Sequence, residues 1–317
     1  MTRHFLFLGA RTLTCLLALA CGGWLLLSCG KRADTSPKPP QLPAFEFLGA
    51  WGEKGDDPGK FSQPVAFSTD VQGNVYFADP GRGSVDKFEP KGTPLLSFED
   101  GRLRHASGIA VDNGGAIYVA DAQRGSILIF FPNGDFLRAL RAPAQPHWSG
   151  PLGISVDASG NLFVPDPAHS SVLKFDARGR LSRPWKGPQE AAPANERPSG
   201  VAAGADGSIF VAYAKSGLVE KYSSDGALLT NWNAAPAPPG EADALSGIAV
   251  TGKFVFTAGP ASPRIRVWTL DGQPKVEADL EGRLNGINAV QLAVTPRDEL
   301  LIFDPATSRV LRFRLHL

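Results

Sequence analysis

The sequence predicts an all-β fold that is built from six similar sheet units. Short apolar runs with a period of two, as in Val75–Phe77, alternate with polar turns along most of the chain. A period of two places successive side chains on opposite faces of a strand, whereas a helix requires spacings of three and four over about ten residues. Gly (35) and Pro (27) are spread between these runs, which is typical of many strands joined by tight turns.

A repeat of about 45 residues organises the chain. Each unit has an apolar run, a Gly turn, a second run that often ends in Ala-Asp, another turn and a third run. The units begin at Pro64, Ser107, Pro151, Pro198, Leu245 and Ile287. The second runs close at Asp79, Asp121, Asp166, Tyr213, Ala258 and Asp304, at intervals of 42 to 47 residues. This period suits a four-stranded blade, so we predict a six-bladed β-propeller with four-stranded antiparallel blades.

The two ends of residues 45–317 predict how the ring closes. The last repeat stops at Leu317 after its third strand, while Phe45–Ala50 resembles a fourth strand that precedes the first blade. We therefore expect Phe45–Ala50 to pair with Val310–Leu315 and to complete the sixth blade. Closure of this kind removes open strand edges, which would otherwise pair with other chains.

The first 28 residues have the pattern of an export signal. Arg3 and Arg11 precede an apolar stretch, Thr12–Leu27, that is short for a membrane-spanning helix. The stretch ends in Leu-Leu-Ser-Cys, which resembles a bacterial lipobox and implies cleavage before Cys29 and lipidation of this cysteine. An uncleaved membrane helix and an ordinary cleaved signal are the alternatives, and Lys31 and Arg32 give the first some support.

Residues 29–44 then form a polar, Pro-rich tether behind the lipid-bearing Cys29. Two acyl chains hold a protein stably on a membrane, whereas one holds it only reversibly. We expect the protein to lie in a bacterial cell envelope as a membrane-anchored lipoprotein, on the periplasmic or the cell-surface side. All three cysteines, Cys15, Cys21 and Cys29, precede the repeats, so the repeats contain no disulfide or thiolate site.

The repeats resemble the NHL repeat family, whose motif is PxGIAVDxxGxIYVADxxxxxIxxF. The resemblance covers residues 45–317, and it is weakest in the fourth and fifth units, where Tyr213 and Ala258 replace Asp. It implies that the first strand of each blade lines a central channel. NHL-like propellers include lyases and lactonases, whose metals are held by His, Glu, Asn or Asp at the channel mouth.

The residues that match the channel mouth offer little chemistry. They are Pro64-Val65, Ser107-Gly108, Leu152-Gly153, Ser199-Gly200, Ser246-Gly247 and Asn288-Ala289. None is a carboxylate or an imidazole, and a divalent metal usually needs at least three protein ligands. We therefore expect no catalytic residue, no cofactor and no metal, with His105 and His147 as the weak candidates for a metal site. The recurring Asp residues are expected to bind the backbone of their own turns.

One face of the ring is predicted to recognise a ligand. Basic or aromatic residues recur in the loops of this face: Arg82, Arg124, His169, Lys215, Arg264, Arg309, Trp148 and Trp185. Arg and Trp are enriched where proteins bind partners. We expect a binding or scaffold protein for a protein, peptide or glycan, with a metal-dependent lyase or lactonase and a structural envelope component as alternatives. The net charge of +1 and the export signal argue against nucleic acid.

Overall fold

The computed structural model describes residues 44–141, 153–182, 185–186, 196–234, 245, 247–259, 264–280 and 291–317. The chain divides into two units, Met1–Gln41 and Leu42–Leu317, and every described residue belongs to the second. The predicted signal peptide, most of the predicted tether, and its Cys29 lie outside the described residues.

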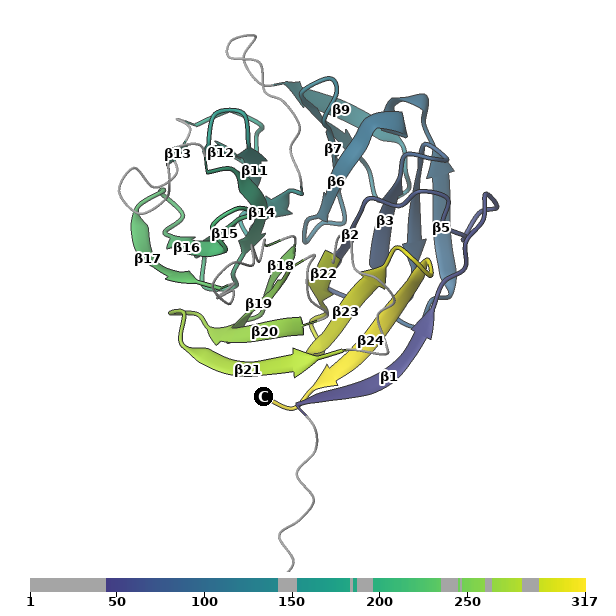
Figure 1. Cartoon of the computed structure of the whole chain (residues 1–317). Helices are drawn as coiled ribbons and strands as arrows, with labels where there is room; N and C mark the ends of the chain where they lie inside the picture. The colour runs from purple at the N-terminus through teal and green to yellow at the C-terminus, as the bar shows by residue number, and fades with distance from the viewer. Residues whose placement is uncertain are drawn as a thin grey trace, which may run out of the picture. The chain divides into compact units, whose positions relative to one another are not determined.

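Six four-stranded antiparallel sheets form the blades of a propeller, as predicted (Figure 1). Blade 1 contains β2 (Ala66–Thr69), β3 (Val75–Asp79), β4 (Ser84–Phe88) and β5 (Pro94–Glu99). Blade 2 contains β6 (Ala106–Val111), β7 (Ile117–Asp121), β8 (Ser126–Phe130) and β9 (Phe136–Arg141). Blade 3 contains β10 (Ser155–Val156), β11 (Leu162–Asp166), β12 (Ser171–Phe175) and β13 (Trp185–Lys186).

The second half of the ring repeats this order. Blade 4 contains β14 (Pro198–Ala203), β15 (Ile209–Tyr213), β16 (Leu218–Tyr222) and β17 (Leu228–Asn233). Blade 5 contains β18 (Gly247–Val250), β19 (Phe254–Ala258), β20 (Arg264–Thr269) and β21 (Pro274–Asp279). Blade 6 contains β22 (Gln291–Val294), β23 (Glu299–Asp304), β24 (Arg309–Leu315) and β1 (Phe45–Trp51).

A short 3-10 helix, η1 (Gly101–His105), connects blade 1 to blade 2. It is fixed by Leu103, which is fully buried between the two blades, and by Asp100, whose carboxylate accepts a hydrogen bond from the Arg102 backbone N–H. Within the described residues, no helix has the length and hydrophobicity that crossing a membrane requires.

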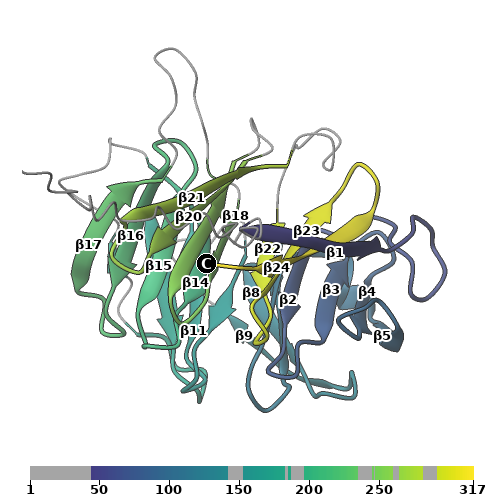
Figure 2. The ribbon, with the colours of Figure 1, turned by 90° about the horizontal axis from the view of Figure 1, so that it is seen from below.

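The predicted closure of the ring is confirmed. Strand β1 pairs antiparallel with β24, with Phe45 opposite Leu315 and Trp51 opposite Val310. The pairing is visible where the purple strand lies beside the yellow one in Figures 1 and 2. Blade 6 therefore joins β1 to the three last strands of the chain in one sheet, and β24 has a paired strand on each side.

Most of the recurring Asp residues bind their own turns, as expected, whereas Asp79 accepts its two shortest backbone bonds from Ser62 and Gln63, in the loop before β2. Asp70, Asp112 and Asp157 each accept two backbone N–H bonds in the turn between the first two strands of their blade. Asp121 and Asp304 accept backbone N–H bonds from the turn that follows them. The strand register also corrects the expected end of the second run in blade 5. Val255 in β19 takes the position of Val75 in β3, and four residues further on Gly259, not Ala258, is the equivalent of Asp79.

The core lies between adjacent blades and is separated into six apolar clusters. At five of the seams, an apolar side chain on the outer strand of one blade covers a glycine in the last hairpin of the next blade. The pairs are Trp51 with Gly92, Phe98 with Gly134, Leu140 with Gly179, Trp185 with Gly226, and Trp232 with Gly272. These glycines all have positive φ between 81° and 95°. In the sixth blade, no such hairpin exists, because β24 and β1 come from opposite ends of the chain.

Candidate functional site

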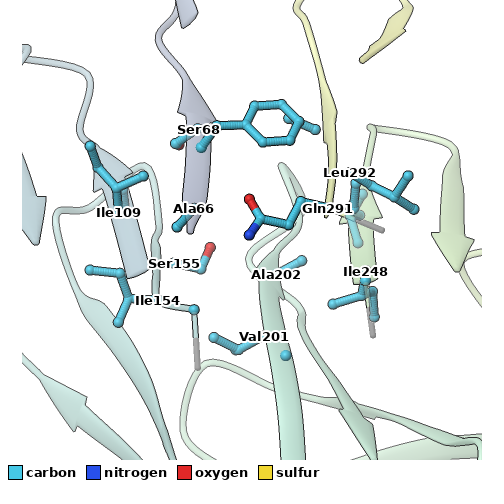
Figure 3. Close-up of a pocket in the computed structure, with 18 of the residues that line it drawn as sticks. Ala66, Ser68, Ile109, Ile154, Ser155, Val201, Ala202, Ile248, Gln291 and Leu292 are labelled. Atoms are coloured by element: carbon cyan, nitrogen blue, oxygen red, sulfur yellow. The ribbon is translucent and has the colours of Figure 1, made fainter. Parts of the chain in front are cut away.

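The innermost strands of the six blades enclose a central channel with a cavity of about 630 Å³ (Figure 3). Its wall is made from β2, β6, β10, β14, β18 and β22 and the residues that lead into them. Val65, Ser107, Gly153, Ser199 and Gly247 lie in this wall, so the predicted position of these strand starts is confirmed where the structure describes them.

The described wall of the channel is apolar with a few neutral polar groups. Its apolar side chains include Ile109, Ile154, Val201, Ile248 and Leu292, and no ionisable side chain is present among the described lining residues. The polar side chains are hydroxyl or amide groups, which donate and accept hydrogen bonds without carrying charge. Such a wall can surround an uncharged, largely apolar group.

Five polar side chains in the described wall already have backbone partners, among them the hydroxyl groups of Thr69, Ser107 and Ser199, which donate to backbone carbonyls. The Gln291 Nε2 atom donates to the Val65 carbonyl and so connects the innermost strand of blade 6 to blade 1. The Ser155 Oγ atom accepts a hydrogen bond of 3.0 Å from the Ala203 N–H and connects blade 3 to blade 4. Figure 3 shows both side chains in the channel. These bonds hold the channel's shape, while the Gln291 amide oxygen can still accept a hydrogen bond and the Ser155 hydroxyl can still donate one to a ligand.

The predicted basic ring is only partly an exposed surface. Arg82 is 8% exposed, and its guanidinium forms a buried ion pair of 3.0 Å with Asp86. The same guanidinium reaches Ser97 at 3.2 Å and Glu99 at 3.5 Å. Arg82 therefore connects three elements of blade 1 and is not presented to a partner.

Three further predicted residues are paired within their own blades. The Arg124 guanidinium lies 2.8 Å from Asp121, and the His169 Nδ1 atom lies 2.7 Å from Asp166. Arg264 lies 3.1 Å from Glu277 and is also paired with Asp279 at 3.7 Å. Lys215 is exposed in its turn, whereas Arg309, which was expected in a loop, is the exposed first residue of β24.

Trp185 packs between blades 3 and 4. Its ring lies 5.4 Å from that of Phe163 and 5.7 Å from that of Tyr222, and it covers Gly226. Trp148 and His147 lie outside the described residues. His105 ends η1 and is half-buried. Within the described part of the chain, no group of three or more His, Cys, Asp or Glu residues is placed to hold a metal ion.

Sequence reasoning missed a second cluster of charged residues, on the outer part of the seam between blades 1 and 2. It contains Arg102, Arg124 and Arg141, of which the loop pattern predicts only Arg124 as a binding residue. A signal was present in the repeats: the positions that hold Asp86 and Glu99 in blade 1 hold Leu128 and Arg141 in blade 2.

The blade number, strand order and central channel define the chain as a six-bladed β-propeller. A family model described as NHL repeat matches residues 103–130, which run from η1 to the end of β8. The match covers part of the region between blade 1 and blade 3, namely η1 and the first three strands of blade 2, so the likeness to the NHL repeat is shown for this one repeat. A comparison with curated proteins finds no match to the sequence.

Solved structures share this fold at low sequence identity. A streptogramin B lyase is similar with a TM-score of 0.61 and 16% identity, over 80% of this chain and 79% of that one. Virginiamycin B lyase from Staphylococcus aureus is similar with a TM-score of 0.62 and 11% identity, over 86% of this chain and 99% of that one. Chaetomium thermophilum Raptor is similar with a TM-score of 0.59 and 14% identity, over 86% of this chain but 30% of Raptor.

Proposed function

We propose that this propeller is a non-catalytic binding or scaffold module, held on the outer side of a bacterial membrane by lipid on Cys29. Its ligand is a protein, peptide or glycan that binds on the face where the innermost strands begin. Loops on a rigid scaffold are a common place for recognition, and the rigid element here is the ring of six blades.

The observation that carries this proposal is the chemistry of the channel wall. A cavity of about 630 Å³ lies within the range of about 300–1,000 Å³ that is typical of ligand pockets. Its described wall combines apolar side chains with neutral hydroxyl and amide groups. Burial of an apolar group there gains roughly 25 cal/mol for each Å² removed from water, and Gln291 and the Ser residues orient it by hydrogen bonds.

Filling the channel tests this proposal. Ser68 lines the channel, and Ser68→Phe places an apolar ring in the cavity. Ser159→Phe makes the same change on an exposed turn of blade 3 and is the matched control. Partners are captured by cross-linking to the tagged full chain on intact cells. We expect Ser68→Phe to lose the captured partner and Ser159→Phe to retain it, with both variants unfolding at the wild-type temperature. Equal capture by both variants would contradict a ligand at the channel.

Attachment to the membrane has its own test. We expect Cys29→Ser to abolish incorporation of labelled palmitate and to move the protein from the membrane to the soluble fraction. Cys21→Ser, which changes the less suitable cysteine, leaves both unchanged. Labelling that persists in Cys29→Ser would contradict the proposed attachment site.

A metal-dependent lyase or lactonase is the second candidate, because two of the similar solved structures are lyases. The similarity to these lyases concerns the fold alone. In this chain, His105 and His147 would have to contribute the metal ligands. Metal analysis of the purified chain distinguishes the two functions. Stoichiometric zinc or calcium that is lost in His105→Ala or His147→Ala would replace the binding proposal with the enzymatic one.

A further inference from the structure

A second pocket lies at the outer part of the seam between blades 1 and 2, and its lining shares no residue with the central channel. Its volume is about 550 Å³. The described lining consists of Arg102, Asp121, Arg124, Ser126, Leu128, Phe136, Ala139 and Arg141. Three arginines thus converge on one pocket whose remaining wall is mainly apolar.

The charges of the pocket leave an excess of positive charge. Arg124 is paired with Asp121 at 2.8 Å, and Arg102 is paired with Asp100 at 2.7 Å. No ion pair of Arg141 with another described residue is found, and Arg141 is exposed. Since two carboxylates face three guanidinium groups, one further negative charge is favoured here.

Blade 1 shows how the same position is neutralised inside the protein. The register of the strands aligns Asp79 with Asp121 and Ser84 with Ser126, so Arg82 is the equivalent of Arg124. In blade 1, Asp86 and Glu99 supply carboxylates that lie 3.0 Å and 3.5 Å from Arg82. The space beside the loop arginine is therefore filled by the blade's own acidic side chains.

Blade 2 lacks both of these carboxylates. Leu128 lies opposite Ala139, where blade 1 has Asp86 opposite Ser97. Arg141 lies opposite Ser126, where blade 1 has Glu99 opposite Ser84. An acidic position has thus become a basic one, and an apolar floor replaces a buried carboxylate.

In blade 5, acidic residues on the outer strand pair with arginines of the neighbouring strand, which stand at the positions of Ser84 and Asp86. Glu277 and Asp279 occupy the outer-strand positions of Ser97 and Glu99, and they pair with Arg264 and Arg266. Blades 1 and 5 have an acidic residue, Glu99 or Asp279, at the last of these outer-strand positions. Blade 2 has Arg141 there instead.

An aromatic side chain completes the wall of the blade 2 pocket. The Arg102 guanidinium carbon lies 3.6 Å from the centre of the Phe136 ring. This stacking holds the guanidinium flat against the ring, while its Nε and Nη2 atoms donate to the Asp100 carboxylate. Phe136 is 36% exposed, so the ring also offers apolar surface to a ligand.

We propose that this pocket binds an organic acid, whose carboxylate takes the place that Asp86 and Glu99 hold in blade 1. The carboxylate lies between Arg124 and Arg141, and the apolar part of the ligand packs on Leu128, Ala139 and Phe136. The site is separate from the central channel and does not depend on the function proposed above.

The test uses benzoate as the probe, with benzamide as its uncharged analogue of the same shape, and the purified full-length chain. Binding is measured by NMR shift titration and by calorimetry. We expect benzoate to bind at least tenfold more tightly than benzamide, and its affinity to fall as salt concentration rises. Equal binding of the two probes, or no binding of benzoate, would overturn the proposal.

Arg141→Glu restores the blade 1 pattern and is the decisive variant. Its carboxylate is expected to pair with Arg124 and to exclude benzoate, with at least a tenfold loss of affinity and no loss of thermal stability. Arg138→Glu makes the same charge change on β9, at a residue that donates to the Arg178 carbonyl of blade 3. It is expected to change affinity less than twofold. Unchanged benzoate binding in Arg141→Glu would reject this pocket as the site.

Discussion

Single glycines set how closely neighbouring blades approach. Gly226 has φ of +87°, and a Cβ atom at this position would lie 2.5 Å from the Trp185 indole nitrogen. A non-glycine residue at such a φ is strained, and the indole would also have to move. The same arrangement at four other seams indicates that the outer strands are spaced by these contacts.

Gly226→Ala is expected to destabilise the protein more than Gly207→Ala, a matched change in the same blade. Gly207 has φ of +81°, yet nothing lies within 4 Å of the place that an added Cβ atom would take. Gly207→Ala should therefore cost only the left-handed strain, about 1–2 kcal/mol. The clash with Trp185 should add about 1–3 kcal/mol for Gly226→Ala. Urea unfolding of both variants measures the difference, and equal losses would show that Trp185 moves freely.

A buried carboxyl makes the stability of blade 4 depend on pH. Burial raises the pKa of Glu220, although the hydrogen bond of 2.5 Å from the Tyr222 hydroxyl opposes the rise. The folded protein therefore keeps a proton that the unfolded chain releases at lower pH. The free energy of unfolding should fall as pH rises from the ordinary carboxyl range, about 4.3, through the raised pKa.

Glu220→Gln should remove this decline, because an amide does not titrate. The variant is expected to gain stability relative to wild type as pH rises through this window, in urea unfolding at a series of pH values. Glu89→Gln, on the surface, should leave the wild-type profile unchanged. Parallel profiles for Glu220→Gln and wild type would contradict a raised pKa.

Residue roles that depend on local sequence could be predicted, and those that depend on distant strands could not. Asp112 was expected to bind its own turn because the turn follows it directly, and it does. The burial of Arg82, in the turn between β3 and β4, depends on Asp86 in β4 and Glu99 in β5. Their meeting is fixed by strand register, which the spacing of repeats does not reveal.

At the scale of elements, β1 determines whether the ring is complete. The sequence predicted its partner because the last repeat lacked a fourth strand, and the structure places Glu46 opposite Arg314 in β24. Their side chains also form an ion pair of 3.0 Å. Loops between blades could not be derived in the same way, because they lack the periodic pattern that identifies strands.

The register of β1 can be tested with an engineered disulfide. Cysteines in place of Glu46 and Arg314 should oxidise to a disulfide and raise thermal stability, because directly opposed strand residues meet the requirement of about 4.4–6.8 Å between Cα atoms. The native cysteines are replaced by Ser in this protein. Cysteines at Glu46 and Arg312 should not pair, since Arg312 lies opposite Gly49. Efficient oxidation of the second pair instead of the first would show a different register.

For the whole molecule, the closed ring makes each blade depend on two neighbours. Trp51 of blade 6 packs on Phe61, Phe77 and Phe88 at the first blade, with ring centres 4.9 to 6.2 Å apart. This seam joins the two ends of the propeller without a hairpin. The number of blades was predictable from the repeat period, and the closing contacts follow from the extra strand.

Trp51→Ala should lower the stability of the whole propeller by about 3 kcal/mol, the range for losing a large aromatic side chain. Tryptophan fluorescence and circular dichroism should still report one common transition in urea. Trp232→Ala, at the seam between blades 4 and 5, is the comparison and should show a similar loss. Separate transitions by the two methods would show that the blades unfold independently.

The place where β1 joins the ring has a mechanical consequence. Phe45, at the start of β1, pairs with Leu315, and the Ala44 carbonyl accepts a hydrogen bond from the His316 N–H. Tension applied to the chain ahead of Ala44 would act on these bonds one after another, as in opening a zip, rather than on all of them together. The sixth blade would therefore yield to a pulling force before the five blades whose outer strands are held by hairpins.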